Sequence, residues 1–185
     1  MIYVALLRGI NVGGQRSIKM AGLSTLFESL NFQNVRTYVQ SGNVVFESRL
    51  KDAAAIAGNI EKKITRTYGF DVKVILRTIV EFENIVSHNP FTSERTIEID
   101  KLHVTFLQGL PDKQSVSTLD IKKEINERYI VQGREIYLYC PNGYGRTKLN
   151  NGAFERNLKL PATTRNWKTT NKLLEISRTG PFVKK

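Results

Sequence analysis

The sequence has one cysteine, two histidines and no long apolar run, and these scarcities exclude several classes of protein. A single cysteine, Cys140, cannot form an internal disulfide, so folding has to rest on the burial of apolar side chains. Two isolated histidines, with no C-x-x-C, H-E-x-x-H or G-x-S-x-G pattern, predict no metal site, no cofactor and no familiar hydrolase. No apolar stretch approaches the roughly 20 residues of a membrane helix, and the N-terminus lacks the features of a secretory signal. We therefore expect a cytoplasmic protein with no membrane association.

Acidic residues are scarce relative to basic ones. The chain has 28 lysines and arginines against 17 aspartates and glutamates, which gives a net charge of +11. The segment from Arg146 to Lys185 alone holds ten basic and two acidic residues, which is +8 of that total. Such a field attracts phosphate groups, nucleic acid or an acidic partner, although a basic face can also serve solubility alone.

The first 78 residues predict six elements in the order β-α-β-β-α-β, which is the ferredoxin-like plan. Asn31 and Gly69 are expected to end the two helices, because both residues tolerate the left-handed backbone that stops a helix. Gly42 is expected to supply the positive φ of a hairpin turn. The predicted strands are 2–7, 35–39, 44–47 and 72–76, and apolar residues at helical spacing fill the intervals 20–30 and 53–68.

The same plan repeats in the second half after a short helix at 80–87 and a linker at 93–99. The repeat concerns element order, since no residue-level identity between the halves is evident. The predicted fold is therefore α+β, with two tandem ferredoxin-like (βαββαβ) subdomains at 1–78 and 101–185 and a connecting region at 79–100. The expected elements are strands at 102–107, 128–131, 135–140 and 160–164, helices opened by Pro111-Asp112 and spanning 147–158, and a C-terminal helix near 166–176.

Connection geometry predicts which loops are neighbours. Because the first two strands of a split β-α-β unit run parallel, the loop after the first strand and the turn after the second lie at one edge of the sheet. This reasoning brings together Arg8, Asn11, Ser41 and Asn43 in the first half. In the second half it places the loop 142–148 beside the end of the last strand.

Four motifs stand out along the chain. They are Leu6-Leu7-Arg8-Gly9-Ile10-Asn11-Val12-Gly13-Gly14, Gln40-Ser41-Gly42-Asn43-Val44-Val45-Phe46, Gly145-Arg146-Thr147-Lys148-Leu149 and Thr164-Arg165-Asn166-Trp167. Together they resemble the domain of unknown function 1697 family of bacterial proteins. This resemblance covers nearly the whole chain and implies two ferredoxin-like subdomains. It implies no activity, cofactor or catalytic residue.

The loop at 145–148 is the first candidate site, because glycines, basic side chains and a predicted helix start together favour a bound phosphate. Alternatively, Thr147 caps the helix, the glycines make a turn and Trp167 packs the last helix onto the sheet. A second candidate is the loop pair with Arg8, Asn11, Ser41 and Asn43, which can equally be a structural turn. The candidate ligand-binding residues of the first site are Arg146, Thr147, Lys148, Arg165, Asn166 and Trp167.

These observations leave three functions open. The favoured one is binding of a phosphate-bearing small molecule; the others are non-specific binding of nucleic acid through the basic C-terminal segment, and a protein-interaction or oligomerisation module. An enzyme is not excluded, because phosphoryl transfer needs mostly positioning and positive charge, but no acid, base or nucleophile stands out. Cys140 would be a reactive thiol only if Arg146 lowered its pKa, and a plain half-buried cysteine is the simpler expectation.

Overall fold

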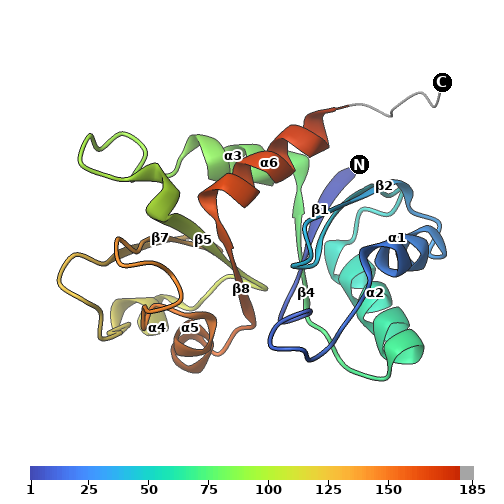
Figure 1. The fold of residues 1–185 in the computed structure, drawn as a ribbon, viewed down its shortest axis with the longest axis horizontal. Coiled ribbons are helices and arrows are strands. Elements are labelled where there is room, and N and C mark those ends of the chain that lie inside the picture. The colour runs from blue at the N-terminus through green and yellow to red at the C-terminus, as the bar shows by residue number, and fades with distance from the viewer. Residues whose placement is uncertain (180–185) are drawn as a thin grey trace. The chain divides into compact units, whose positions relative to one another are not determined.

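The structure is a computed structural model that describes residues 1–179 of the 185-residue chain (Figure 1). Within that range the protein has a mixed α/β fold with two four-stranded antiparallel sheets and six α-helices. It divides into two compact units. The first unit is Met1–Asn84 together with residues 172–179, and the second is Ile85–Asn171.

The first unit contains one sheet, in which the strand order is β2-β3-β1-β4 and every neighbouring pair is antiparallel. Gly69 (φ 79°) ends α2 as expected, and at the other end of this helix the Asp52 carboxylate accepts hydrogen bonds from the Ala54 and Ala55 N–H groups. Asn31, at φ 62°, follows the first helix. The elements are β1 (Ile2–Leu7), α1 (Met20–Glu28), β2 (Gln33–Tyr38), β3 (Asn43–Glu47), α2 (Ala53–Tyr68) and β4 (Val74–Thr78).

The core of the first unit lies between its sheet and the two helices α1 and α2, which cover the same face of the sheet (Figure 1). Alternate residues of β1 point into this core, including Tyr3 and Leu7, and both are fully buried. Three phenylalanines from α1, the following turn and β3 pack together, with ring centroids 4.6 to 5.9 Å apart. Each such ring contributes about 1.5–3 kcal/mol through burial, so this cluster is a main source of stability for the unit.

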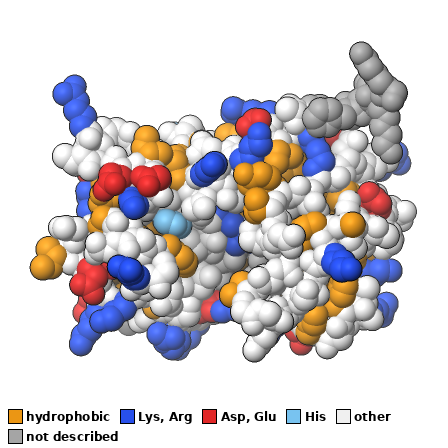
Figure 2. Space-filling view, viewed as in Figure 1, with side chains coloured by type: hydrophobic (Ala, Val, Ile, Leu, Met, Phe, Trp, Pro, Cys, Tyr) orange, Lys and Arg blue, Asp and Glu red, His pale blue; other side chains and the backbone are white. Residues whose placement is uncertain are grey.

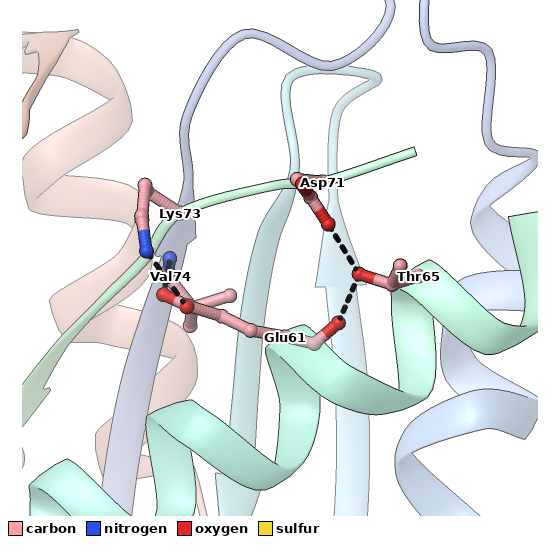
Figure 3. Close-up of polar contacts among 5 residues, drawn as sticks. All are labelled: Glu61, Thr65, Asp71, Lys73 and Val74. Atoms are coloured by element: carbon pink, nitrogen blue, oxygen red, sulfur yellow. Dashed lines mark hydrogen bonds and ion pairs between the residues drawn. The ribbon is translucent and has the colours of Figure 1, made fainter. Parts of the chain in front are cut away.

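A polar brace joins α2 to the start of β4 (Figure 3). The Glu61 carboxylate accepts a hydrogen bond from the backbone N–H of Val74 at 2.9 Å and lies 3.3 Å from Lys73 Nζ. One turn later, the Thr65 hydroxyl lies 2.8 Å from the Asp71 carboxylate and 3.1 Å from the Glu61 carbonyl (Figure 3). These contacts satisfy the edge N–H of β4 and hold the loop after α2 against the helix.

The second unit has a sheet of order β6-β7-β5-β8, again antiparallel throughout. Its apolar core includes Leu107, Leu138 and Phe154, which are fully buried between the sheet and α5. The helices α3 (Ile79–Ser87) and α6 (Trp167–Arg178) each follow the fourth strand of a sheet. The remaining elements are η1 (Ile99–Lys101), β5 (Leu102–Leu107), α4 (Lys113–Ser117), β6 (Arg128–Gln132), β7 (Glu135–Tyr139), α5 (Asn151–Leu158) and β8 (Ala162–Asn166).

One predicted boundary is wrong in a way that matters for the site. The helix expected from Thr147 begins only at Asn151, because the Asn150 side chain is the cap and accepts a hydrogen bond from the Ala153 N–H at 3.0 Å. Thr147 instead accepts a hydrogen bond from the Leu149 N–H at 2.9 Å and holds a turn before the helix. The last strand is also displaced from 160–164 to Ala162–Asn166.

The two units repeat each other at the level of individual residues, which the sequence did not reveal. Leu7 of β1 pairs with the first residue of β4, and Leu107 of β5 pairs with the first residue of β8. With these two leucines aligned, Glu155 of α5 takes the place of Glu61, since it accepts from the first N–H of β8 at 2.8 Å. A buried arginine follows at the same register in both units, Arg77 opposite Val4 and Arg165 opposite Val104.

Candidate functional site

The two loops of the second candidate lie together at one edge of the first sheet, as connection geometry predicted. The Asn11 amide donates to the Gln40 carbonyl at 2.8 Å, and the Leu7 N–H donates to the Gly42 carbonyl at 2.8 Å. Gly42 has φ 72°, and a Cβ there would lie 2.8 Å from Leu7 Cβ and Ile10 Cδ1, so the turn requires glycine.

The polar side chains of these loops are used mainly to hold the turns. Asn11, itself at φ 55°, also donates to the Ile18 carbonyl and accepts from the Ile18 N–H. Asn43 is fully buried and donates to the Tyr38 carbonyl and the Ser41 hydroxyl. Arg8 is half-buried at the same edge, and its backbone N–H donates to the Lys73 carbonyl. These hydrogen bonds brace the two loops against each other. They support the interpretation of this loop pair as a structural turn.

The first candidate loop presents its residues alternately to solvent and to the interior. Arg146 and Lys148 are exposed, whereas Thr147 between them is buried beside Cys140. Burial raises the pKa of the Cys140 thiol to about 12; the charge of Glu127 adds to the rise and a hydrogen bond with Thr147 offsets part of it. Cys140 is therefore a protonated thiol at neutral pH, and Arg146 does not activate it.

Arg165 and Trp167 are also turned inward. The Arg165 guanidinium is buried and donates at 2.8 Å to both the Thr163 hydroxyl and the Thr164 carbonyl. Burial lowers the pKa of Arg165 to about 10, which leaves the group charged at neutral pH. Trp167 is buried at the start of α6, and the exposed Asn166 caps this helix by accepting from the Thr169 N–H. Of the six predicted ligand-binding residues, only Arg146, Lys148 and Asn166 thus lie at the surface.

A chain of polar groups, buried at Thr105 and half-buried at Thr164 and Asn151, ties α5 to the second sheet. The Thr105 and Thr164 hydroxyls lie 2.6 Å apart, and the Thr164 hydroxyl donates to the Asn151 side chain at 2.6 Å. Tyr144 lies at the same end of the sheet and stacks on His103, with ring centroids 4.9 Å apart. Its hydroxyl is buried and has no hydrogen-bond partner among the described residues.

This polar chain is specific to the second unit. The residues at the same register in the first unit are Ala5, which matches Thr105, and Leu76, which matches Thr164. An apolar pair therefore satisfies the fold at this position, and buried hydroxyls are tolerated only when they are hydrogen-bonded. In the second unit the Thr164 hydroxyl bonds the side chain of Asn151, the first residue of α5, and so holds the start of that helix. The apolar side chain of Leu76 cannot make this bond in the first unit.

A cavity of about 300 Å³ lies at the start of α5, within the second unit. Three cations line it: Lys122 from the segment before β6, Lys148 from the first candidate loop, and Arg156 from α5. None of the three forms a hydrogen bond or ion pair with any residue in the described range. Its other lining residues are Asp120, Ile121, Asn150, Ala153 and Asn157. Figure 2 shows lysine and arginine side chains gathered over the surface where Figure 1 places α4 and α5.

Gly152 lies beside the third cation on the surface of α5. A Cβ at Gly152 would lie 3.3 Å from Arg156 Nη1 and 3.5 Å from Asn150 Oδ1, so the guanidinium lies back along the helix toward its first turn.

Sequence reasoning found Lys148 but missed Lys122, Arg156 and Gly152. The spacing of Gly152 and Arg156, four residues apart on one helix face, was a readable signal once the helix start was placed at Asn151. Lys122 lies in an irregular segment, and no periodicity in the sequence links it to α5.

Two further observations concern metal ions and membranes across residues 1–179. In that range no group of three or more histidine, cysteine, aspartate or glutamate side chains is arranged to hold a metal ion. No helix there has the length and apolar character needed to cross a membrane.

Comparison with known proteins agrees with the resemblance seen in the motifs. Residues 1–137 match the model of a family described as protein of unknown function (DUF1697). A solved structure described as a conserved bacterial protein from Streptococcus pneumoniae is similar over 96% of this chain and 98% of that one, with 26% sequence identity and a TM-score of 0.74. Among curated proteins, none matches the sequence.

Proposed function

Because the chain belongs to the DUF1697 family, whose description carries no activity, we propose a function from the site alone: the protein binds a phosphate-bearing small molecule in the cavity at the start of α5. The observation that carries this proposal is the set of three cations, Lys122, Lys148 and Arg156, around one cavity without a protein partner among the described residues. A location in the cytoplasm is part of the same proposal.

Electrostatics favours an anion at this place over solvent alone. Three positive side chains raise the local potential at the cavity. A phosphate oxygen gains about 1.5–3 kcal/mol from each charge-assisted hydrogen bond, and an exposed site retains the lower part of that range because solvent screens it. Loss of one cation should therefore weaken binding by about tenfold, which corresponds to about 1.4 kcal/mol.

The direct test is a calorimetric titration of inorganic phosphate and of phosphate monoesters into the wild-type protein at low ionic strength. Lys148→Ala and Arg156→Ala are each expected to weaken binding about tenfold. Lys168→Ala is the matched control, because Lys168 is an exposed lysine of the same unit that does not line the cavity and its loss changes the net charge equally. Equal weakening by all three variants would mean that only the overall charge attracts the anion, and the proposed site would be abandoned.

The nucleic-acid alternative makes a different prediction for the same protein. Binding of a single-stranded oligonucleotide to a basic surface weakens steeply with salt because counterions are released, and all exposed lysines contribute. Lys168→Ala would then matter as much as Lys148→Ala. An interaction module remains a third proposal, for which sedimentation at high protein concentration is the test of self-association.

We also assign both units to the ferredoxin-like plan. What supports this assignment is the β-α-β-β-α-β order of elements in each unit and the strand orders β2-β3-β1-β4 and β6-β7-β5-β8. In the second unit the cavity is lined by two connections of this plan, the segment between α4 and β6 and the connection through α5 between β7 and β8.

A further inference from the structure

We propose that the molecule bound in this cavity is the phosphate monoester of a sugar or another polyol. This inference rests on the proposed function, which supplies the phosphate, and it assigns the rest of the ligand. Five lining residues remain beside the three cations: Asp120, Ile121, Asn150, Ala153 and Asn157.

Asp120 is the first of these groups. A carboxylate repels phosphate, so a cavity meant for phosphate alone gains nothing from an aspartate in its wall. Although three cations line the same cavity, Asp120 forms no ion pair or hydrogen bond with any described residue. Its oxygens are acceptors only, and the donors that suit them on a small neutral body are hydroxyl groups.

The two asparagines complete a pattern suited to hydroxyl groups. Asn150 uses its oxygen to accept from the Ala153 N–H, which leaves its two amide hydrogens as donors. Asn157 uses its amide to donate to the Ala153 carbonyl, which leaves its oxygen as an acceptor. A hydroxyl group both donates and accepts, and this cavity offers it the amide hydrogens of Asn150 as donors and the oxygens of Asp120 and Asn157 as acceptors.

The remaining surface of the cavity suits a sugar better than a nucleobase. No aromatic side chain lines it, and its apolar residues Ile121 and Ala153 offer aliphatic contact only. Recognition of a base commonly uses an aromatic platform, yet the nearby Tyr144 is stacked on His103 and Trp167 is buried. The volume of about 300 Å³ is at the small end of ligand cavities, which favours a compact body.

The test compares four probes by calorimetry with the wild-type protein: inorganic phosphate, glucose 6-phosphate, adenosine 5′-monophosphate and glucose. Glucose 6-phosphate is expected to bind about tenfold more tightly than inorganic phosphate, which has no sugar hydroxyl groups to reach Asp120 and the asparagines. The same margin is expected over the nucleotide, because its base finds no aromatic side chain in the lining and its ribose offers fewer hydroxyl groups than glucose does. Equal affinity for inorganic phosphate and glucose 6-phosphate, or tighter binding of the nucleotide, overturns this inference and leaves the phosphate site in place. No binding of any phosphate-bearing probe removes the proposed function, and this inference with it.

Asp120→Asn tests the recognition of the hydroxyl groups separately from the recognition of the phosphate. The substitution keeps the shape and removes a charge that repels phosphate, so affinity for inorganic phosphate should stay equal or rise while the preference for glucose 6-phosphate falls about tenfold. Glu98→Gln is the control, since Glu98 is an exposed acid of the same unit outside the cavity. If Asp120→Asn leaves the preference unchanged, or if Glu98→Gln alters it equally, Asp120 does not read the hydroxyl groups and the inference fails.

Discussion

Replacing Thr164 by valine should destabilise the second unit, and the size of the effect follows from the hydrogen bonds that Thr164 makes. Its hydroxyl accepts from Thr105 and donates to Asn151, both at 2.6 Å. Valine has the same shape but cannot replace either bond. Each lost bond is worth about 1 kcal/mol, and the Thr105 hydroxyl, which is fully buried, would also be left unsatisfied at a further cost of about 1–3 kcal/mol. The expected loss in the free energy of unfolding is therefore about 3–5 kcal/mol.

The double variant Thr105→Ala/Thr164→Val supplies the sharper test. The first unit carries an alanine and a leucine at the corresponding positions, so an apolar pair is compatible with this register. Removing both hydroxyls leaves only Asn151 without its partner, and the double variant should be at least as stable as Thr164→Val alone. The two changes together would then cost clearly less than the sum of the single changes.

The assay is urea unfolding followed by the fluorescence of Trp167, the single tryptophan of the chain, which lies buried in the second unit. Thr25→Val is the control, because Thr25 is exposed on α1 and its hydroxyl only donates to the Ala21 carbonyl in the same helix. A loss below about 0.5 kcal/mol for Thr164→Val, or strict additivity in the double variant, would refute the reasoning that this polar chain is a coupled, buried unit.

Three other perturbations have definite expected outcomes. Gly42→Ala should lower the free energy of unfolding by about 1–3 kcal/mol, measured by urea unfolding, because φ is 72° and the new Cβ would lie 2.8 Å from Leu7 and Ile10; an unchanged midpoint would show that the turn can relax. The Cys140 thiol, whose pKa burial raises to about 12, should react with a disulfide reagent at pH 8 far more slowly in the native protein than in urea; rapid native labelling would contradict its burial. Burial also lowers the pKa of His103, so the unfolded chain binds more protons near its usual pKa of about 6.5, and stability should fall as the pH drops through that value. His103→Gln should flatten this part of the pH profile, and an unchanged slope would assign it to other groups.

Much of the fold follows from local chemistry that is readable in the sequence. Asp52 and Asp112 cap their helices, Gly69 ends one, and Gly42 makes the hairpin turn, because each of these roles depends on a residue's own hydrogen bonds or backbone freedom. The contact between the Asn11 loop and the hairpin turn could also be predicted from the sequence. A right-handed crossover between the first two strands places the ends of both strands at the same edge of the sheet.

Only part of the candidate site could be predicted from the sequence. Arg146, Lys148 and Thr147 alternate between the two sides of their segment, but sequence alone does not say which side faces the interior. The buried side is chosen by the groups packed against it, here Cys140 and the core beneath α5, and that choice turned Thr147 inward and left Lys148 at the cavity.

By itself, the sequence determined the family, the order of helices and strands, and most of the turns, because these depend on residues close together along the chain. Only the tertiary structure decided which charges share a cavity. Lys122 and Arg156 lie 34 positions apart in the sequence, and they meet Lys148 because an irregular segment and α5 line the same cavity. It also decided that Thr105 and Thr164 form a hydrogen-bonded polar pair where the first unit has Ala5 and Leu76, since strand register brings together residues that are distant in sequence.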